Sequence, residues 1–170
     1  MENLPKTRLR AIEPEDLEDL YLIENDQELW RVGITNVPYS RFALHEYLAS
    51  VTGDIFTDKQ LRLIIENMEG ETIGLVDLCN FDPRHMRAEV GIVLQTRFHD
   101  KGYGRSAMLQ LIRYSHEVVH LHQMYALVSL HNVRSMELFR TIGFQQVAEI
   151  SDWLYDGEHY ESVILMQYFL

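Results

Sequence analysis

Apolar and polar residues alternate in several short stretches of the chain, and this period of two is typical of β-strands. Seven stretches carry the pattern: residues 7–12, 61–66, 72–78, 88–94, 124–130, 144–154 and 160–169. A turn signal at Met68-Glu69-Gly70 separates the second stretch from the third, and Asp156-Gly157 separates the last two. Both pairs are therefore expected to form antiparallel hairpins.

Apolar residues spaced three and four apart indicate about four helices between these strands. The helices are expected at residues 14–24, from Ser40 towards Gly53, from Tyr103 to His116 or beyond, and at residues 133–142. Gly143 follows the last helix in the usual helix-stop position. Strands and helices in this order predict a mixed α/β (α+β) sheet with antiparallel and parallel parts, in a single domain over residues 1–170.

The composition is that of a folded, acidic protein, with 46% hydrophobic and 24% charged residues and a formal net charge of −11. This charge opposes binding to nucleic acid or to an anionic membrane surface, and it leaves room for cationic substrates such as amines. Cys79 is the only cysteine, which excludes a disulfide framework and a cysteine-rich zinc site. No apolar run approaches the ~18 residues of a membrane span, and the first residues do not resemble a signal peptide. A cytoplasmic location is expected.

The segment Gly102-Tyr103-Gly104 opens a predicted helix a few residues after an apolar strand. Glycine lets the backbone approach a ligand closely, and a first helical turn presents unpaired N–H groups, so the segment is a candidate phosphate site. Arg97, Lys101 and Arg105 make it locally basic. The alternative is a tight turn that only caps the helix. The dinucleotide-binding fingerprint is rejected, because about eight residues separate the strand from the first glycine.

The run His99-Asp100-Lys101-Gly102-Tyr103-Gly104 resembles the acyl-CoA signature Gln/Arg-x-x-Gly-x-Gly/Ala of the GCN5-related N-acetyltransferase (GNAT) family. His99 in the first position departs from that signature. Other segments are reminiscent of the same family in the same order: residues 7–10, 14–17, 73–76, 88–92 and 131–144. The chain looks most like the branch that holds ribosomal-protein N-terminal acetyltransferases and spermidine acetyltransferases.

The resemblance implies a GNAT-like fold in which the fourth and fifth strands splay apart and acetyl-CoA, the cosubstrate, lies between them. Backbone groups of one strand would pair with the pantetheine arm, and the amides of the glycine loop would cradle the pyrophosphate. Asn132 would hydrogen-bond the cofactor arm, cap the next helix, or do both. No metal is expected, and relatives imply a homo-oligomer. The implied cofactor-binding residues are Ile92, Val93, Leu94, His99, Asp100, Lys101, Gly102, Tyr103, Gly104, Arg105, Asn132 and Phe139.

The implied reaction is direct attack of a neutral amine on the thioester, which needs a base for the ammonium proton. Glu89 and Asp77 are the candidate bases, the alternative being that each is a solvated or salt-bridged strand residue. His85 and His131 are weaker candidates. Relatives place a tyrosine, which protonates the leaving thiolate, where this chain has Phe139, and Phe139 also fits the apolar stripe of its helix. Three possibilities stay open: solvent donates the proton, another group such as Tyr125 does, or the chemistry is slow.

We therefore expect an acetyl-CoA-dependent N-acetyltransferase that acts on a small cationic amine such as a polyamine. The stretch at residues 33–38 lacks the acids that spermidine acetyltransferases carry between their first two helices, which weakens the polyamine case. An N-terminal protein acetyltransferase and a non-catalytic acyl-CoA-binding module stay open. His116-Glu117-Val118-Val119-His120 matches a zinc-hydrolase helix and is a remote alternative. Specificity is expected from residues 30–39 and 152–158.

Overall fold

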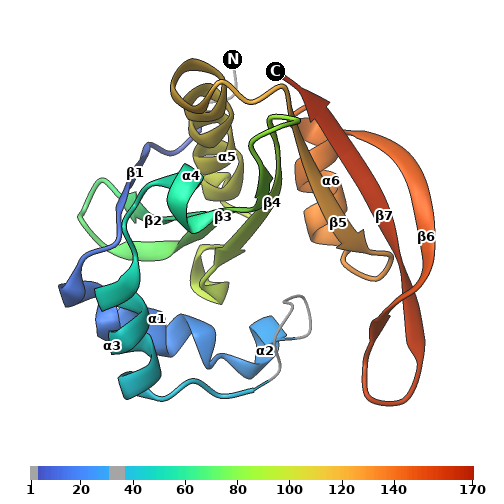
Figure 1. Cartoon of the computed structure of the whole chain (residues 1–170). Helices are drawn as coiled ribbons and strands as arrows, with labels where there is room; N and C mark the ends of the chain where they lie inside the picture. The colour runs from blue at the N-terminus through green and yellow to red at the C-terminus, as the bar shows by residue number, and fades with distance from the viewer. Residues whose placement is uncertain (1–3, 31–36) are drawn as a thin grey trace.

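The computed structural model describes residues 4–30 and 37–170 and contains one seven-stranded sheet (Figure 1). The strands lie in the order β1-β2-β3-β4-β5-β7-β6. Their bounds are Thr7–Ala11 (β1), Leu61–Asn67 (β2), Thr72–Asp82 (β3), Arg87–Leu94 (β4), Gln123–Ser129 (β5), Gln145–Tyr155 (β6) and Tyr160–Phe169 (β7). All neighbouring pairs are antiparallel except β4 and β5, which are parallel. The expected mixed sheet is confirmed.

Six α-helices lie between the strands in the described part of the chain: Leu17–Glu24 (α1), Gln27–Trp30 (α2), Arg41–Ser50 (α3), Ile55–Asp58 (α4), Tyr103–Tyr114 (α5) and Val133–Thr141 (α6). The four longer helices lie where the apolar spacing predicts them. The expectation of about four misses α2 and α4, because four residues are too few to show a period of 3.6. None of the helices in residues 4–30 and 37–170 has the length and apolar character that a bilayer-spanning segment requires.

Helices cover both faces of the central strands. α5 lies on one face, where Ala107 and Leu111 are buried in the same cluster as Ile65 of β2. α1 and α3 lie on the other face, where Leu20 is buried with Ile64 of β2. Ile64 and Ile65 belong to opposite layers because successive side chains of a strand point to opposite faces. The middle of the sheet is thus packed from both sides.

β4 and β5 pair over only three residues, Arg87–Glu89 with Gln123–Tyr125. Beyond this point the two strands diverge, and α6 lies beside β5 across the opening (Figure 1). The splay expected from the family resemblance is therefore present. It leaves residues 90–94 of β4 without a β5 partner in the ladder, so the backbone groups on that edge are open to a ligand.

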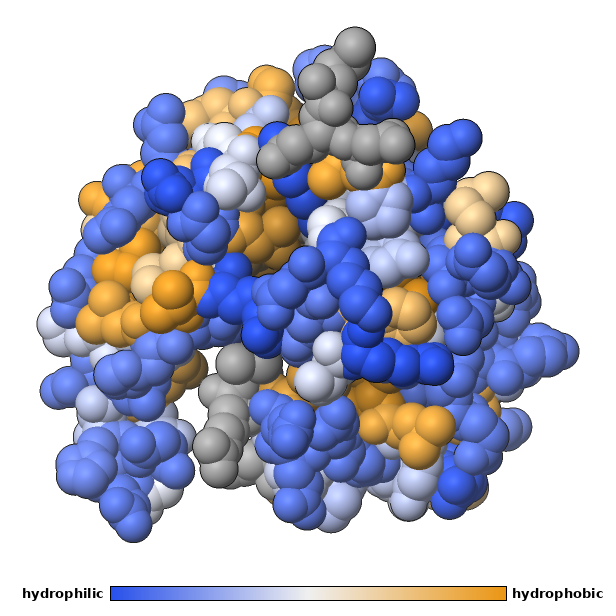
Figure 2. Space-filling model, turned by 180° about the vertical axis from the view of Figure 1, so that it is seen from behind, coloured by the Kyte–Doolittle hydropathy of each residue, from blue (hydrophilic) through white to orange (hydrophobic). Residues whose placement is uncertain are grey.

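β6 and β7 form a long hairpin at the edge of the sheet, and most residues of β6 are exposed. At its tip the backbone N–H groups of Glu158 and His159 donate to Asp156 Oδ1, so the turn expected at Asp156-Gly157 is confirmed. Figure 2 shows this tip as a hydrophilic lobe that a hollow separates from the rest of the rear face. The hairpin therefore forms one side of the opening between the two halves of the sheet.

Candidate active site

A cleft of about 660 Å³ lies at the opening between β4 and β5. Its lining comes from β2, β3, β4, β5 and β7, from α1, α2, α3 and α6, and from residues 153–154 of β6. In the described residues, the charged side chains that line it are three carboxylates and one guanidinium: Glu24, Asp77, Glu89 and Arg62. The cleft is therefore acidic and suits a cationic ligand.

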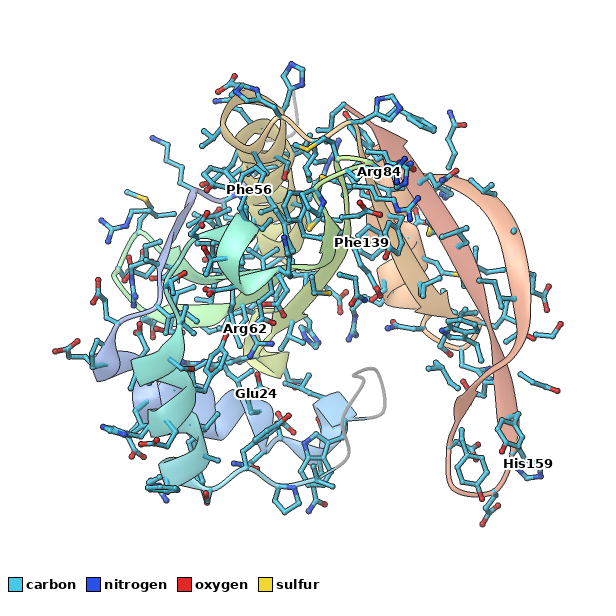
Figure 3. All side chains as sticks on the ribbon, in the orientation of Figure 1. Glu24, Phe56, Arg62, Arg84, Phe139 and His159 are labelled. Atoms are coloured by element: carbon cyan, nitrogen blue, oxygen red, sulfur yellow. The ribbon has the colours of Figure 1, made fainter. Side chains whose placement is uncertain are left out.

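Arg62, on β2, holds two of these carboxylates. Its Nε and Nη2 atoms donate to the two Oδ atoms of Asp77 at 2.7 and 3.0 Å, and its Nη1 atom donates to Glu24 at the end of α1 (Figure 3). Burial opposes the charge of Arg62, but Asp77 and Glu24 outweigh it and raise the pKa of the guanidinium. A carboxylate whose two oxygens are both bound to one arginine is a poor proton acceptor. The geometry therefore disfavours Asp77 as the base.

Glu89 is held much less firmly. It is the last residue of β4 that pairs with β5, opposite Tyr125, at the point where the two strands begin to part. Its Oε2 atom accepts a hydrogen bond of 2.8 Å from the neutral side chain of Asn80. Among the described residues no cation pairs with Glu89, so its carboxylate is available as a proton acceptor. His85 and His131, the weaker candidates, do not line the cleft.

The charge of Glu89 acts on two neighbouring groups. Cys79 lies opposite Glu89 in the β3–β4 register, and burial, followed by the charges of Glu89 and Asp77, raises the pKa of its thiol to about 12. Burial and the charge of Glu89 also raise the pKa of Tyr125. Both groups therefore stay protonated near neutral pH. Cys79 lines the cleft. Tyr125 is not part of the described lining, but it lies on the same face of the sheet as Glu89, its partner in the register.

The glycine loop, residues 99–104, connects β4 to α5. Gly102 has φ +84°, a left-handed conformation that favours glycine, and it is the N-cap of α5. Hydrogen bonding within α5 begins with the Ser106 N–H, which donates to the Gly102 carbonyl. The N–H groups that precede Ser106 in this first turn have no partner within the helix and can serve an anion. The glycine-opened helix is confirmed, and its phosphate role stays a prediction.

Arg134, on α6, connects this loop to the far side of the opening. Its Nη1 atom donates to His99 Nδ1 at 2.7 Å, and its Nε and Nη2 atoms reach the two Oδ atoms of Asp100 at 3.3 Å. His99 Nε2 in turn donates to the Leu94 carbonyl at 2.8 Å. These side chains line a second hollow of about 550 Å³, and Leu29 lines both hollows. The glycine loop therefore adjoins the cleft.

The other side chains of the loop contact neighbouring protein groups. Lys101 Nζ donates to the Arg97 carbonyl at 2.7 Å, and the ring of Tyr103 meets Phe98 edge to face at 5.7 Å. Arg105 lies in the first turn of α5. The loop is therefore held by its own side chains, and its backbone amides are the groups best placed to meet an anion.

The β4 residues expected to bind the cofactor differ in their surroundings. Ile92 and Val93 line the cleft. Leu94 packs against the glycine loop, since a Cβ atom at Gly104 would lie 3.5 Å from its Cδ1 atom. All three lie on the stretch of β4 that β5 leaves unpaired. Successive residues direct their backbone groups to opposite edges of the strand. The Gln95 N–H donates to the Ile73 carbonyl of β3, so Val93 directs its backbone groups towards β3, and Ile92 and Leu94 direct theirs towards the opening.

Two residues of α6 also line the cleft. Asn132 caps the helix, with its Oδ1 atom accepting from the Ser135 N–H at 3.1 Å, so its capping role is confirmed. Phe139 is 3% exposed and its ring lies 5.0 Å from that of Phe144, so its role in core packing is confirmed as well. Figure 3 places Phe139 on the far side of the opening from Arg62. The position at which the family resemblance implies a tyrosine hydroxyl therefore carries a phenyl ring, which has no proton to donate.

Known proteins resemble the chain along nearly its whole length. A family model described as acetyltransferase (GNAT) domain matches residues 6–145. The chain belongs to the GNAT family. It is accordingly an N-acetyltransferase, with acetyl-CoA as cosubstrate.

The GNAT relatives include a spermidine N(1)-acetyltransferase of Escherichia coli strain K12, 25% identical over 98% of this chain and 87% of that protein. A putative ribosomal N-acetyltransferase of Bacillus subtilis is 28% identical over 91% of this chain and 87% of its own length. Among solved structures, a spermidine N-acetyltransferase of Vibrio cholerae, in complex with CoA and spermine, superposes with a TM-score of 0.88. That likeness covers 96% of this chain and 95% of the other at 23% identity, and it confirms the GNAT fold.

The zinc-hydrolase motif does not form its helix in this GNAT chain. α5 ends at Tyr114, and residues 115–119 form a π-helical turn. His120 has φ +59° and has left the helix, with its Nδ1 atom 3.2 Å from the His116 carbonyl. In the described residues no three His, Cys, Asp or Glu side chains gather closely enough to hold a metal ion. The two histidines therefore lack the shared α-helical face that the motif requires.

The two regions expected to set specificity both reach the cleft. Trp30 and Tyr39 line it, whereas residues 31–36 between them lie outside the described residues. Trp153 and Leu154, at the start of the 152–158 turn region, line its opposite side. The acid-poor stretch at residues 33–38 falls mostly on the undescribed part, so its effect on polyamines stays a prediction.

Sequence reasoning missed Glu24, Arg62 and Arg134. Arg62 carried a usable signal, because the predicted hairpin places it directly opposite Asp77, and opposite charges pair across strands. Glu24 and Arg134 carried none, since each meets its partners only through long-range packing of separate elements.

Proposed function

We propose that this enzyme transfers the acetyl group of acetyl-CoA to a primary amine of a small cationic molecule of the polyamine class. The observation that carries the proposal is the acidic cleft, where three carboxylates and one guanidinium meet at the parting of β4 and β5. Excess negative charge draws polycations towards such a cleft. The names of the E. coli and V. cholerae relatives, which are spermidine acetyltransferases, support the same substrate class.

The residues around the opening fit acetyl-CoA. The unpaired edge of β4 over residues 92–94 offers the backbone groups of Ile92 and Leu94 to the pantetheine amides, as an added strand would, with Val93 between them. The amides of residues 99–105, at the left-handed Gly102 and the first turn of α5, offer N–H groups to the pyrophosphate. Asn132 reaches the same opening from α6. The proposed cosubstrate thus lies between β4 and α6, with its thioester next to Glu89.

Glu89 is the proposed general base, and it takes the ammonium proton directly or through a water molecule. The neutral nitrogen then attacks the carbonyl carbon and the C–N bond forms. As the intermediate collapses, the nitrogen releases its second proton to solvent, the C–S bond breaks, and CoA leaves as a thiolate. A backbone N–H of β4 near Ile92 is the proposed donor to the oxyanion. The proposed proton donor to the thiolate is solvent, because Phe139 has no proton to give.

Two other functions would give different results in the same assay. An N-terminal protein acetyltransferase would prefer peptides to free polyamines. A non-catalytic acyl-CoA-binding module is favoured by one observation, the buried Phe139 in place of the tyrosine of relatives. Such a module would bind acetyl-CoA and release no thiol with any amine.

The test is acetyl-CoA turnover with spermidine, spermine, putrescine, glucosamine and short peptides, followed by thiol release and product mass. We expect the highest kcat/KM with a polyamine. A peptide with an equal or higher value would overturn the polyamine assignment, and binding of acetyl-CoA without turnover on any amine would overturn the enzyme assignment.

The cofactor loop is tested separately by Gly104→Glu. This substitution puts bulk and negative charge beside the proposed pyrophosphate cradle, so it should abolish the thermal stabilisation by acetyl-CoA. Leu109→Glu, on the exposed side of the same helix, is the matched control and should keep that stabilisation. Gly104→Ala guards against misfolding, since its Cβ atom would meet Leu138 and Leu94 at ordinary contact distances. Unchanged stabilisation in Gly104→Glu would count against the assigned cradle.

The proposal includes a homo-oligomer in the cytoplasm. One V. cholerae relative has a dodecameric structure, and the mostly exposed edge strand β6 offers a surface for a neighbouring subunit. A lone cysteine, Cys79, suits a reducing compartment. Light scattering at micromolar concentration tests the assembly, and a monomer would overturn that part of the proposal.

A further inference from the structure

Gly91, in the middle of β4, meets nothing in the described residues that requires a glycine. Its φ is not positive, and a Cβ atom built on it would meet only Asp77 Cβ, at 3.9 Å. Gly74 shows the contrast, because a Cβ atom there would lie 2.1 Å from the Val93 carbonyl oxygen. A glycine inside a strand weakens the strand, and it often marks a place where a ligand approaches the backbone closely.

The position of Gly91 says which ligand this is. Gly91 lines the cleft, lies opposite Asp77 in the β3–β4 register, and follows Glu89 by two residues on the same face of β4. Asp77 and Glu89 are therefore diagonal neighbours, with Cβ atoms about 7 Å apart or somewhat less. Of the other two positions between them, Cys79 on β3 carries a small side chain and Gly91 on β4 carries none. We call this space, bounded by Asp77, Gly91 and Glu89, the acceptor slot.

We propose that Gly91 determines amine specificity: its missing side chain opens the acceptor slot, in which a primary amine on an unbranched carbon reaches the thioester. The inference rests on the proposed function and deepens it. Glu89 lies on one side of the slot, and its carboxylate takes the proton. Asp77 lies on the other side and attracts the ammonium group, while Arg62 holds its carboxylate in place. An amine on a branched carbon, such as a peptide N-terminus, is wider, and its branch would clash with the side chain of Asp77 or Glu89.

The expected size of the effect follows from the geometry of attack. The nitrogen must come within about 3–3.5 Å of the carbonyl carbon, and a misplacement of about 1 Å costs on the order of 10²-fold in rate. A methyl group at Gly91 would stand on the floor of the slot and displace the nitrogen by a comparable distance. The same methyl group has space in the free protein, so the fold should not suffer.

The experiment compares the wild type with Gly91→Ala. Readouts are the melting temperature, the acetyl-CoA Kd, and kcat and KM for spermidine, n-butylamine and sec-butylamine. The two butylamines share formula and charge and differ only in branching at the carbon that bears the nitrogen. Ala11→Val, which adds methyl groups to an exposed position of β1 outside the described lining of the cleft, is the control.

We expect the wild type to prefer n-butylamine to sec-butylamine by at least about tenfold in kcat/KM, and Gly91→Ala to lose about 10²-fold with spermidine. Its melting temperature should equal or exceed that of the wild type, and its acetyl-CoA Kd should stay within about twofold. Ala11→Val should keep both its activity and its acetyl-CoA Kd. Equal use of the two butylamines, or full activity in Gly91→Ala, would overturn the slot while leaving the proposed function intact.

The same variants separate failure of the slot from failure of the proposed function. If the wild type binds spermidine but acetylates no amine, the proposed function fails, and calorimetry then decides on the slot: weaker spermidine binding in Gly91→Ala supports it, and equal binding overturns it. A wild type that neither binds nor acetylates any amine overturns both.

Discussion

Asp77 and Glu89 are two carboxylates on neighbouring strands of one cleft, yet the structure holds them in opposite ways. Asp77 is bound by both oxygens to Arg62, which also binds Glu24. Among the described residues, Glu89 accepts one side-chain hydrogen bond, from a neutral amide. A largely buried ion pair fixes the position of its carboxylate and occupies both oxygens, whereas an unpaired carboxylate has an oxygen free to accept a proton. The sequence alone makes both residues candidate bases. Only their contacts in the folded protein show that Asp77 has a structural role and that Glu89 can take part in the reaction.

The sharpest way to break this comparison is to neutralise each carboxylate without changing its shape. Glu89→Gln removes the proposed base and should lower kcat by about 10²–10⁴-fold with a polyamine. Asp77→Asn should lower kcat by less than about tenfold in the folded fraction, because the residue it replaces accepts no proton. Initial rates of thiol release, corrected for the folded fraction from circular dichroism, measure both.

The roles would be reversed if Asp77→Asn lost the greater activity while Glu89→Gln stayed active. Acetyl-CoA Kd values serve as the control in both variants, since neither side chain belongs to the proposed cradle. A large change in Kd would point to a disturbed cleft rather than a missing base.

Removing Arg62 tests the other half of the comparison. Arg62→Ala leaves Asp77 and Glu24 as unpaired, largely buried charges, and should lower the free energy of unfolding by about 3–5 kcal/mol. Arg41→Ala is the matched control, because its partner Glu18 is exposed and ion pairs between exposed side chains contribute little to stability. Urea unfolding measures both, and similar losses in the two variants would contradict the structural role of Arg62.

The same contrast explains how much of the fold the sequence predicts. Strand and helix positions follow from local periods, so the seven strands and the four longer helices lie where the apolar pattern places them. Helices of four residues carry no such period, and α2 and α4 are therefore missed. The π-helical turn at residues 115–119 is missed for a related reason, since the apolar pattern there does not distinguish one helical pitch from another.

The candidate site divides in the same way. Gly102 and Asn132 act through the backbone next to them, so motif and spacing locate both correctly as helix caps. The relation of Asp77 to Glu89 depends on Arg62, which comes from another strand, and the hairpin register is the only sequence signal for it. Arg134 contacts His99 across 35 residues of chain, and no local pattern predicts that contact.

Asp16 extends the comparison to the stability of the fold against acid. Burial acts to raise its pKa, but hydrogen bonds from Arg10 and from the Glu13 N–H outweigh burial, and the pKa is lowered below its ordinary value of 3.8. A lowered pKa means that Asp16 stabilises the fold above its unfolded pKa and loses this effect as pH falls through its folded pKa. Asp16→Asn should therefore be least stable relative to the wild type near pH 6, with the gap narrowing towards pH 3. Urea unfolding across this range measures the gap, and a gap that widens in acid would contradict the ion pair.

The alkylation rate of the Cys79 thiol depends on the charge of Glu89 and can be measured without catalysis. Of the predicted effects, we expect this one to be the smallest. Burial and the charges of Glu89 and Asp77 raise its pKa to about 12, so the wild-type thiol should react slowly with iodoacetamide at pH 8, with a rate that still rises at pH 10. Glu89→Gln removes one of these charges, lowers the pKa of the thiol and should speed alkylation by less than about tenfold, which is a shift of under one pKa unit. The chain unfolded in urea sets the upper limit of the rate. Equal rates in the wild type and Glu89→Gln would mean that the carboxylate of Glu89 is neutral or distant from Cys79, and a neutral Glu89 could not accept the proton of the amine.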